Sequence, residues 1–296
     1  MTKSVFNIQI PAFAIFFFCY LRYLKYICRD ENQKKEPLKT EKPLILVSND
    51  DGAESKGLEI LINIAREFGD VVVAAPIEAR SGMSHAITIN TPVRAEKIRE
   101  EEDLAVYRTN GTPVDSVKLA INQLLPRKPD FLFSGVNHGS NAAISVIYSG
   151  TMGAAIEGCL NRIPSAGFSL TNHDSDADFT ASELYIRKIV ENIIRSGLPE
   201  DTCLNVNIPV ATPEEIRGVK VCRQTRGVWK EEYDRRTDPG NKTYYWLTGF
   251  FNNYEAAAED TDEWALKNNY VAVVPVHIDF TAYKALEHLK TWNYEI

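Results

Sequence analysis

The apolar residues of this chain alternate between short continuous runs and longer one-sided faces. Residues 44–48, "LILVS", and 71–76, "VVVAAP", are continuous apolar runs, which is typical of strands buried on both faces. Between them, residues 57–69 carry their apolar side chains at helical spacing and end in Gly69. A strand, a helix and a strand in this order predict a parallel sheet with helices on its faces.

The alternation continues toward the C-terminus and predicts an α/β fold with a mostly parallel sheet. Helices are expected at 111–125, 151–162, 181–197 and 282–290, and strands at 130–135, 164–170, 203–209 and 270–276. The first of these helices has clear start signals, because Thr112 can cap it, Pro113 fits its first position and Asp115 is an early acid.

Residues 229–250, within a segment of about 227–250, have a different character. Two arms rich in aromatic and charged residues flank Asp238, Pro239, Gly240 and Asn241, which predicts a β-hairpin with its turn there. The arms are too polar for the core of an α/β sheet. We therefore expect the hairpin to project and to contact another subunit.

Composition narrows the possible functions. The chain has 296 residues with 44% hydrophobic content, and 33 Lys and Arg against 40 Asp and Glu give a net charge of −7. An acidic chain of this kind is unsuited to holding duplex nucleic acid by its phosphates. Its 5 cysteines form no C-x-x-C pair, which argues against a disulfide framework or a thiolate zinc site and favours a cytoplasmic location.

The first 42 residues are predicted to lie outside the fold, which leaves 43–296 as the domain. Residues 10–21, "IPAFAIFFFCYL", are strongly apolar but shorter than the ~20 residues of a membrane-spanning helix. Two interpretations stay open for residues 1–28: association with a membrane, or an extension without function. Residues 29–42 read as a charged linker.

Candidate chemistry begins directly after the first strand, at Asn49, Asp50, Asp51 and Gly52. Two adjacent carboxylates repel each other unless a cation or a shared proton lies between them. Oxygen ligands suit a hard divalent ion such as Mg²⁺ or Mn²⁺. An ordinary Asp-Asp-Gly turn is the alternative.

Polar loops also follow two later strands, and ligands of open α/β sheets bind at such strand ends. In residues 75–89, Ser81 can supply a metal ligand and His85 is either catalytic or structural. In residues 134–151, Asn137 and Asn141 offer carboxamide groups. The stretch "YSGT", 148–151, leads into a helix and predicts either an anion site or a simple helix cap.

Five stretches together resemble the SurE family (survival protein E), metal-dependent nucleotidases that act on nucleoside monophosphates. They are "ILVSNDDG", "RSGMSHAIT", "GTPVDSVKLA", "FSGVNHGSN" and "YSGTMGAAIEG". The resemblance covers 43–296 and implies a Rossmann-like three-layer core. It also implies a homodimer or homotetramer built through the hairpin and an exchanged C-terminal segment.

The resemblance further implies a set of site residues. One Mg²⁺ or Mn²⁺ ion per subunit is expected at Asp50, Asp51, Ser81 and Asn137, with the first two also catalytic. Contacts to the substrate phosphate are expected from Asn49, Asn141, Ser149, Gly150 and Thr151. The implied reaction is hydrolysis of nucleoside 5′-monophosphates, with 3′-nucleotides and short polyphosphate as further substrates, and with either water or Asp50 as the nucleophile.

The chain departs from the family pattern at Ala143 and Ser145, where relatives carry Gly and Asp. These departures leave a second interpretation open, a non-catalytic nucleotide-sensing module. A third is a membrane-tethered scaffold that uses the apolar N-terminus and the aromatic hairpin.

Overall fold

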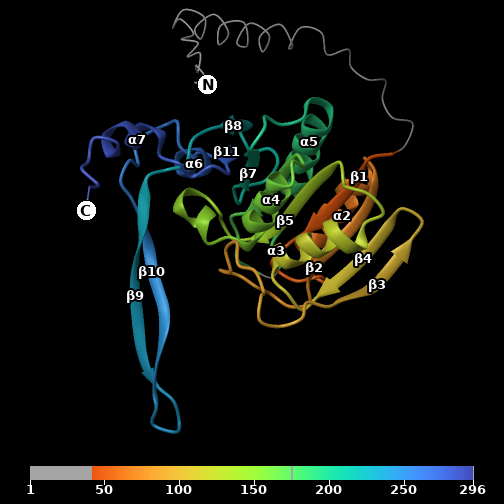
Figure 1. Ribbon diagram of the computed structural model, residues 1–296, viewed down its shortest axis with the longest axis horizontal. Helices are drawn as coiled ribbons and strands as arrows, with labels where there is room; N and C mark the ends of the chain where they lie inside the picture. Colours follow the sequence, from red (N-terminus) through yellow and green to blue (C-terminus); the bar gives the residue numbers. More distant parts are fainter. Residues whose placement is uncertain (1–41, 175, 296) are drawn as a thin grey trace, which may run out of the picture. The chain divides into compact units, whose positions relative to one another are not determined.

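In the computed structural model, which describes residues 42–174 and 176–295, a sheet of nine strands forms the centre of the domain (Figure 1). Its strands are β1 (Leu44–Ser48), β2 (Asp70–Pro76), β3 (Ala95–Glu101), β4 (Leu104–Thr109), β5 (Phe131–His138), β6 (Ser165–Leu170), β7 (Thr202–Ile208), β8 (Val219–Val221) and β11 (Val271–His277). Their order is β3-β4-β2-β1-β5-β6-β7-β11-β8, and neighbours run parallel except in the pairs β3–β4 and β7–β11. The predicted α/β class with a mostly parallel sheet is confirmed.

Helices cover both faces of this sheet. The helices are α2 (Lys56–Arg66), α3 (Pro113–Leu119), α4 (Gly150–Leu160), α5 (Thr180–Ser196), α6 (Asp262–Lys267) and α7 (Tyr283–Leu289). Ile45 and Val47 of β1 join a core with residues of α2 and α5, whereas Leu46 joins a second core with residues of α3 and α4. Because alternate residues of a strand face opposite ways, this arrangement explains why β1 is apolar at every position except its last.

Local sequence sets the ends of two central helices. The Ser55 hydroxyl caps α2 by accepting a hydrogen bond from the Leu58 N–H at 3.3 Å. Helix α3 begins with a capping box between Thr112 and Asp115 and has Pro113 at its first position, as predicted. The expected helix over 111–125 is divided, since α3 ends at Leu119 and a π-helix, Ala120–Leu124, follows.

Strands β3, β4 and β8 and helix α6 have no counterpart among the predicted elements. Strand β3 is the edge of the sheet and reads "AEKIREE", with every residue at least partly exposed. An exposed edge strand has no buried face to impose an apolar alternation on its sequence. This explains why the hydrophobic pattern did not indicate it.

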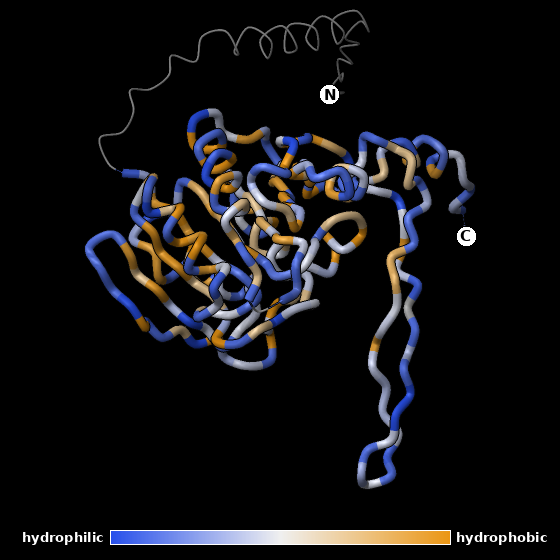
Figure 2. The backbone as a smooth tube through the Cα atoms, turned by 180° about the vertical axis from the view of Figure 1, so that it is seen from behind, coloured by the Kyte–Doolittle hydropathy of each residue, from blue (hydrophilic) through white to orange (hydrophobic). Residues whose placement is uncertain are grey.

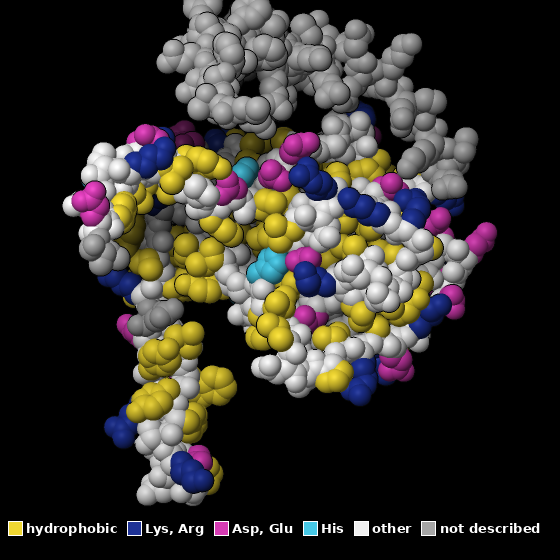
Figure 3. Space-filling view, viewed as in Figure 1, with side chains coloured by type: hydrophobic (Ala, Val, Ile, Leu, Met, Phe, Trp, Pro, Cys, Tyr) yellow, Lys and Arg dark blue, Asp and Glu magenta, His cyan; other side chains and the backbone are white. Residues whose placement is uncertain are grey.

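The segment 227–253 forms a long antiparallel hairpin. Strands β9 (Gly227–Thr237) and β10 (Thr243–Asn253) pair over 11 residues each, and the turn falls on Asp238 to Asn241. The hairpin extends away from the sheet (Figure 1), and most of its positions are hydrophilic or neutral, with hydrophobic ones only in places (Figure 2). Its exposed large side chains include Tyr233, Tyr245, Trp246, Leu247 and Phe250. Figure 3 shows hydrophobic side chains along the hairpin. Its role in assembly stays a prediction.

The predicted extension falls almost entirely outside the described residues. The alternatives for residues 1–28 and the linker nature of 29–41 therefore remain predictions. Over 42–174 and 176–295, the structure has no helix with the length and apolar character needed to cross a bilayer.

Candidate active site

The predicted site residues come together at the carboxyl ends of β1 and β5, which are adjacent parallel strands. Asp50 and Asp51 follow β1 directly. The Thr151 hydroxyl, in the first turn of α4, donates a hydrogen bond to Asp50 Oδ1. The His138 backbone N–H, at the end of β5, donates to Asp51 Oδ2 at 3.1 Å. Three segments far apart in sequence thus converge on two neighbouring carboxylates.

The environment disfavours negative charge on both carboxylates. Asp50 is 3% exposed, and burial raises its pKa from 3.8 to about 6, with repulsion from Asp51 adding to the rise and the Thr151 hydroxyl opposing it. Burial also raises the pKa of Asp51, against the effect of the His138 N–H. Within the described residues neither carboxylate forms an ion pair. A bound cation would offset both the repulsion between the two carboxylates and the cost of burying their charge.

Two asparagines add oxygen atoms to this region. Asn49 is fully buried, and its amide donates to Gly52 O at 3.0 Å and to Ser55 Oγ at 2.7 Å, while its Oδ1 has no hydrogen-bond partner. Asn137 donates its amide hydrogen to Gly139 O at 2.8 Å. The free side-chain atom of Asn49 is therefore an acceptor, which suits a cation rather than a phosphate oxygen.

The donor set fits a hard divalent ion. Among residues 42–174 and 176–295 there is no group of three or more His, Cys, Asp and Glu side chains able to hold a metal. A cation bound here would thus take two carboxylates and complete its shell with amide or hydroxyl oxygens. That set matches the preference of Mg²⁺ and Mn²⁺ and not that of Zn²⁺.

The start of α4 lies directly against Asp50. The Ser149 hydroxyl caps the helix by accepting a hydrogen bond from the Met152 N–H at 3.0 Å. A Cβ added to Gly150 would lie 2.8 Å from the Asp50 Cβ and 2.9 Å from its Oδ2, so only glycine fits this approach. The N-terminus of this 11-residue helix favours an anion. Both of the interpretations for "YSGT", cap and anion site, are compatible with this geometry.

The loop after β2 closes over the same region. The Arg80 N–H donates a hydrogen bond to the Asp50 carbonyl at 2.7 Å. Ser81 is the next residue in the chain, so this bond holds it near Asp50. The Ser81 side chain is exposed and has no hydrogen-bond partner in the described part of the chain. Its hydroxyl is thus available as a ligand.

His85 braces this loop against α4. Its Nε2 lies 3.0 Å from Oε2 of Glu157, a buried residue that also binds Lys118 Nζ at 3.1 Å. This contact favours the structural interpretation of His85 over the catalytic one.

The sequence analysis did not indicate the residues that hold Asn141 in place, which are Ser169, Asn205 and Asn207. Asn141 donates its amide to Ser169 Oγ, its N–H to Asn207 Oδ1, and accepts from Asn205 Nδ2, each at 2.8 Å. The sequence does contain a signal for the two asparagines: the alternation "NVN" in β7 places Asn205 and Asn207 on one face of the strand. His173, whose ring covers Gly139 and which lies close enough to lower the pKa of Asp51, had no signal in the sequence.

Ala143 and Ser145, the two departures from the family pattern, each form a hydrogen bond to another part of the chain. Ala143 adopts φ +51°, a conformation that glycine adopts more easily, and its N–H donates to the buried Asp262 carboxylate at 2.8 Å. The Ser145 hydroxyl accepts a hydrogen bond from Trp229 Nε1 at 3.1 Å.

The comparisons with known proteins all match one family. The family model described as survival protein SurE matches residues 45–231. A Phocaeicola vulgatus protein named 5′-nucleotidase SurE is 54% identical over 259 residues, which is 88% of this chain and 100% of that protein. A Flavobacterium psychrophilum protein of the same name is 50% identical, over 85% of this chain and 98% of that protein. The crystal structure of the SurE protein from Aquifex aeolicus superposes with a TM-score of 0.73 at 38% identity, over 84% of this chain and 98% of that one.

Proposed function

The chain belongs to the SurE family, and from this premise we propose that it is a divalent-cation-dependent phosphatase of nucleoside 5′-monophosphates. That it is an enzyme of the nucleotidase class follows from relatives of about 50% identity over most of its length. The observation that carries the cation dependence is the pair Asp50 and Asp51. Asp50 is buried and Asp51 half-buried, and neither carboxylate has an ion-pair partner among the described residues. Asp50 also lies against the N-terminus of an 11-residue helix.

In this proposal four residues hold one Mg²⁺ or Mn²⁺ per subunit. They are Asp50, Asp51, Ser81 and Asn137. When bound, the cation supplies Lewis-acid polarisation of the phosphoryl group. The buried Asn49 Oδ1, which has no hydrogen-bond partner among the described residues, is a further candidate ligand.

The remaining groups orient the carboxylate and balance phosphate charge. The Thr151 hydroxyl fixes the Asp50 carboxylate by donating to its Oδ1. The Gly150 N–H at the start of α4 has no partner within the described residues and is free to donate to a phosphoryl oxygen. Such preorganised donors contribute about 3 kcal/mol each in comparable oxyanion sites. Asn49, Asn141 and Ser149 complete the phosphate contacts of this proposal.

The test is a panel of phosphomonoesters assayed after EDTA treatment and again with Mg²⁺ or Mn²⁺ restored. We expect phosphate release from nucleoside 5′-monophosphates to disappear with EDTA, to return with the metal and to be lost in Asp50→Asn. Glu214→Gln, at an exposed position, is the matched control and retains full activity. Activity that survives both EDTA and Asp50→Asn contradicts the proposal. Adding 3′-nucleotides and short polyphosphate to the panel defines its breadth, and ¹⁸O-water with a chiral phosphate distinguishes water from Asp50 as nucleophile.

We further propose a homodimer or homotetramer in the cytoplasm. The support is the hairpin, whose Tyr245 and Trp246 are 59% and 58% exposed, because exposed aromatic clusters mark protein interfaces. Light scattering of Tyr245→Ser/Trp246→Ser against the wild type tests this, and an unchanged molar mass contradicts a role for these side chains.

A further inference from the structure

A cavity of about 490 Å³ opens beside the loop that carries Asn141. Its lining includes Ser140, Thr171, Asn253, Glu263, Trp264 and Lys267. Ser140 directly precedes Asn141, a residue expected to contact phosphate, so one wall of the cavity belongs to the same loop. Its volume is in the ~300–1,000 Å³ range of small-molecule sites. Thr171 follows the carboxyl end of β6, so the cavity lies at the ligand-binding edge of the sheet.

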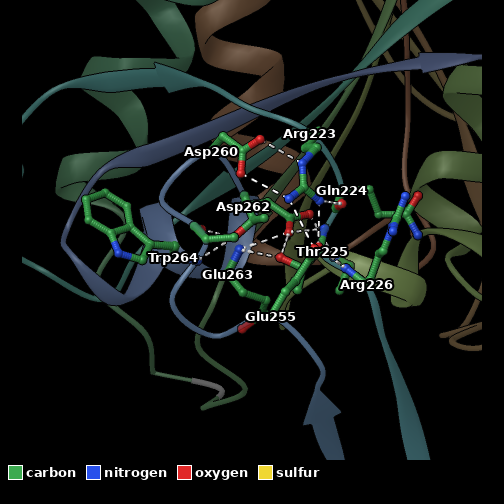
Figure 4. Close-up of polar contacts among 12 residues, drawn as sticks. Arg223, Gln224, Thr225, Arg226, Glu255, Asp260, Asp262, Glu263 and Trp264 are labelled. Carbon is green, nitrogen blue, oxygen red and sulfur yellow. Dashed lines mark hydrogen bonds and ion pairs between the residues drawn. The ribbon is translucent and has the colours of Figure 1, made fainter.

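One wall of this cavity is fixed to the active-site loop. Asp262, at the start of α6, is fully buried and accepts hydrogen bonds from the Ala143 N–H at 2.8 Å and from the Thr225 hydroxyl at 2.6 Å. Figure 4 shows Asp262 within this network, with Glu263 and Trp264 continuing from it along the chain. The distance between the cavity wall and the phosphate region is therefore set by buried hydrogen bonds.

The polar groups that line the cavity have unused hydrogen-bonding capacity. Glu263 is half-buried, and within the described residues its carboxylate accepts no hydrogen bond and forms no ion pair, even with Lys267 four residues later. Burial and the neighbouring Asp262 raise the pKa of Glu263. The Asn253 amide hydrogens and the Thr171 hydroxyl also have no partner in that part of the chain. A carboxylate with this free capacity can accept hydrogen bonds from a ligand that enters the cavity.

Trp264 provides an ordered aromatic surface in the same wall. Lys220 Nζ lies 4.7 Å from its ring centroid, and the Tyr270 ring stacks at 6.3 Å with an interplanar angle of 20°. These contacts hold the indole in place. A fixed indole next to hydrogen-bonding groups is suited to a flat ring that carries polar substituents.

We propose that this cavity receives the nucleoside part of the substrate, with Glu263 accepting hydrogen bonds from the ribose hydroxyls and Trp264 stacking on the base. The two vicinal hydroxyls of ribose can each donate a hydrogen bond to the Glu263 carboxylate, which is how an acidic residue binds ribose in dinucleotide sites. The assignment rests on the proposed nucleotidase function and deepens it, because it names ribonucleotides as the preferred substrate class.

The test compares kcat and KM for AMP, dAMP and phenyl phosphate, the last of which lacks a nucleoside. We expect Glu263→Gln to lower kcat/KM for AMP about tenfold through KM, and to leave dAMP and phenyl phosphate within about twofold. Trp264→Leu should lower both nucleotides about tenfold and spare phenyl phosphate, and Trp264→Phe should restore most of the loss. Glu259→Gln, at an exposed position outside the cavity, is the control and changes none of the three.

Phenyl phosphate turnover shows in every variant that the protein is folded and the phosphate site intact. Equal effects of Glu263→Gln on AMP and dAMP, or no effect of either cavity variant on nucleotide KM, overturn the cavity assignment while leaving the nucleotidase function standing. Absence of AMP hydrolysis by the wild type with either metal overturns the proposed function, and the assignment with it.

Discussion

Replacing Asp50 by Asn is expected to inactivate the enzyme and yet to stabilise the metal-free protein at neutral pH. The structure gives the reason: the carboxylate is 3% exposed, and its pKa is raised from 3.8 to about 6. The folded state therefore binds more protons than the unfolded state between these two pH values, and the free energy of unfolding falls as the pH rises through this window. Asparagine has no charge to bury.

The magnitude follows from the size of that pKa difference. At ~1.4 kcal/mol per pKa unit, ionisation of Asp50 costs the folded metal-free protein about 3 kcal/mol above pH 7. The amide keeps an Oδ1 acceptor for the Thr151 hydroxyl but loses the second acceptor oxygen, which costs about 1 kcal/mol. The net gain of Asp50→Asn is about 2 kcal/mol, or about 4–8 °C in thermal midpoint for a domain of this size.

The assay is urea unfolding in EDTA at pH 8 and at pH 4.5, with and without Mn²⁺. At pH 8 the variant should be the more stable protein. At pH 4.5 Asp50 is ionised in the unfolded state only, so the wild-type penalty falls to about 1 kcal/mol, which equals the cost of the amide, and the gain should vanish. Saturating Mn²⁺ at ~100 times its Kd should add about 2.7 kcal/mol to the wild type alone and so reverse the order. A variant less stable than the wild type at pH 8 in EDTA, or a gain independent of pH, would refute the electrostatic reasoning.

Three further substitutions test the geometry of the site. Gly150→Ala puts a Cβ 2.9 Å from the Asp50 Oδ2, and should cost at least about a hundredfold in kcat/KM, measured by phosphate release, with circular dichroism as the fold control. Thr151→Val removes the hydroxyl that lowers the Asp50 pKa, so the acid limb of the kcat/KM–pH profile should move to higher pH; an unmoved limb contradicts the assigned contact. Asn207→Ala leaves the buried Asn141 N–H without its acceptor and should lower the free energy of unfolding by about 1–3 kcal/mol, measured in urea, whereas a neutral result means that water replaces it.

Much of the core was predictable because each element carries its own evidence. A strand covered on both faces must be apolar at almost every position, so β1 and β2 appear directly in the sequence. A helix start needs partners for its free N–H groups, so Thr112 and Pro113 marked the start of α3. Asp50 and Asp51 were conspicuous for the opposite reason, since two adjacent acids at the end of a buried strand serve no purpose in folding.

The sequence by itself indicated most strands and helices of the core, the hairpin turn and the candidate residues of the site. Tertiary structure alone decided how the first turn of α4 meets Asp50, how Asn205 and Asn207 hold Asn141, and how Glu263 of α6 comes to lie beside the loop at Ser140. The physical reason is the range of the forces involved. Burial of a face and capping of a helix act on neighbouring residues and leave a periodic record in the chain. The pairing of one polar group with another across the sheet depends on the packing of segments up to about a hundred residues apart, and it leaves no local pattern.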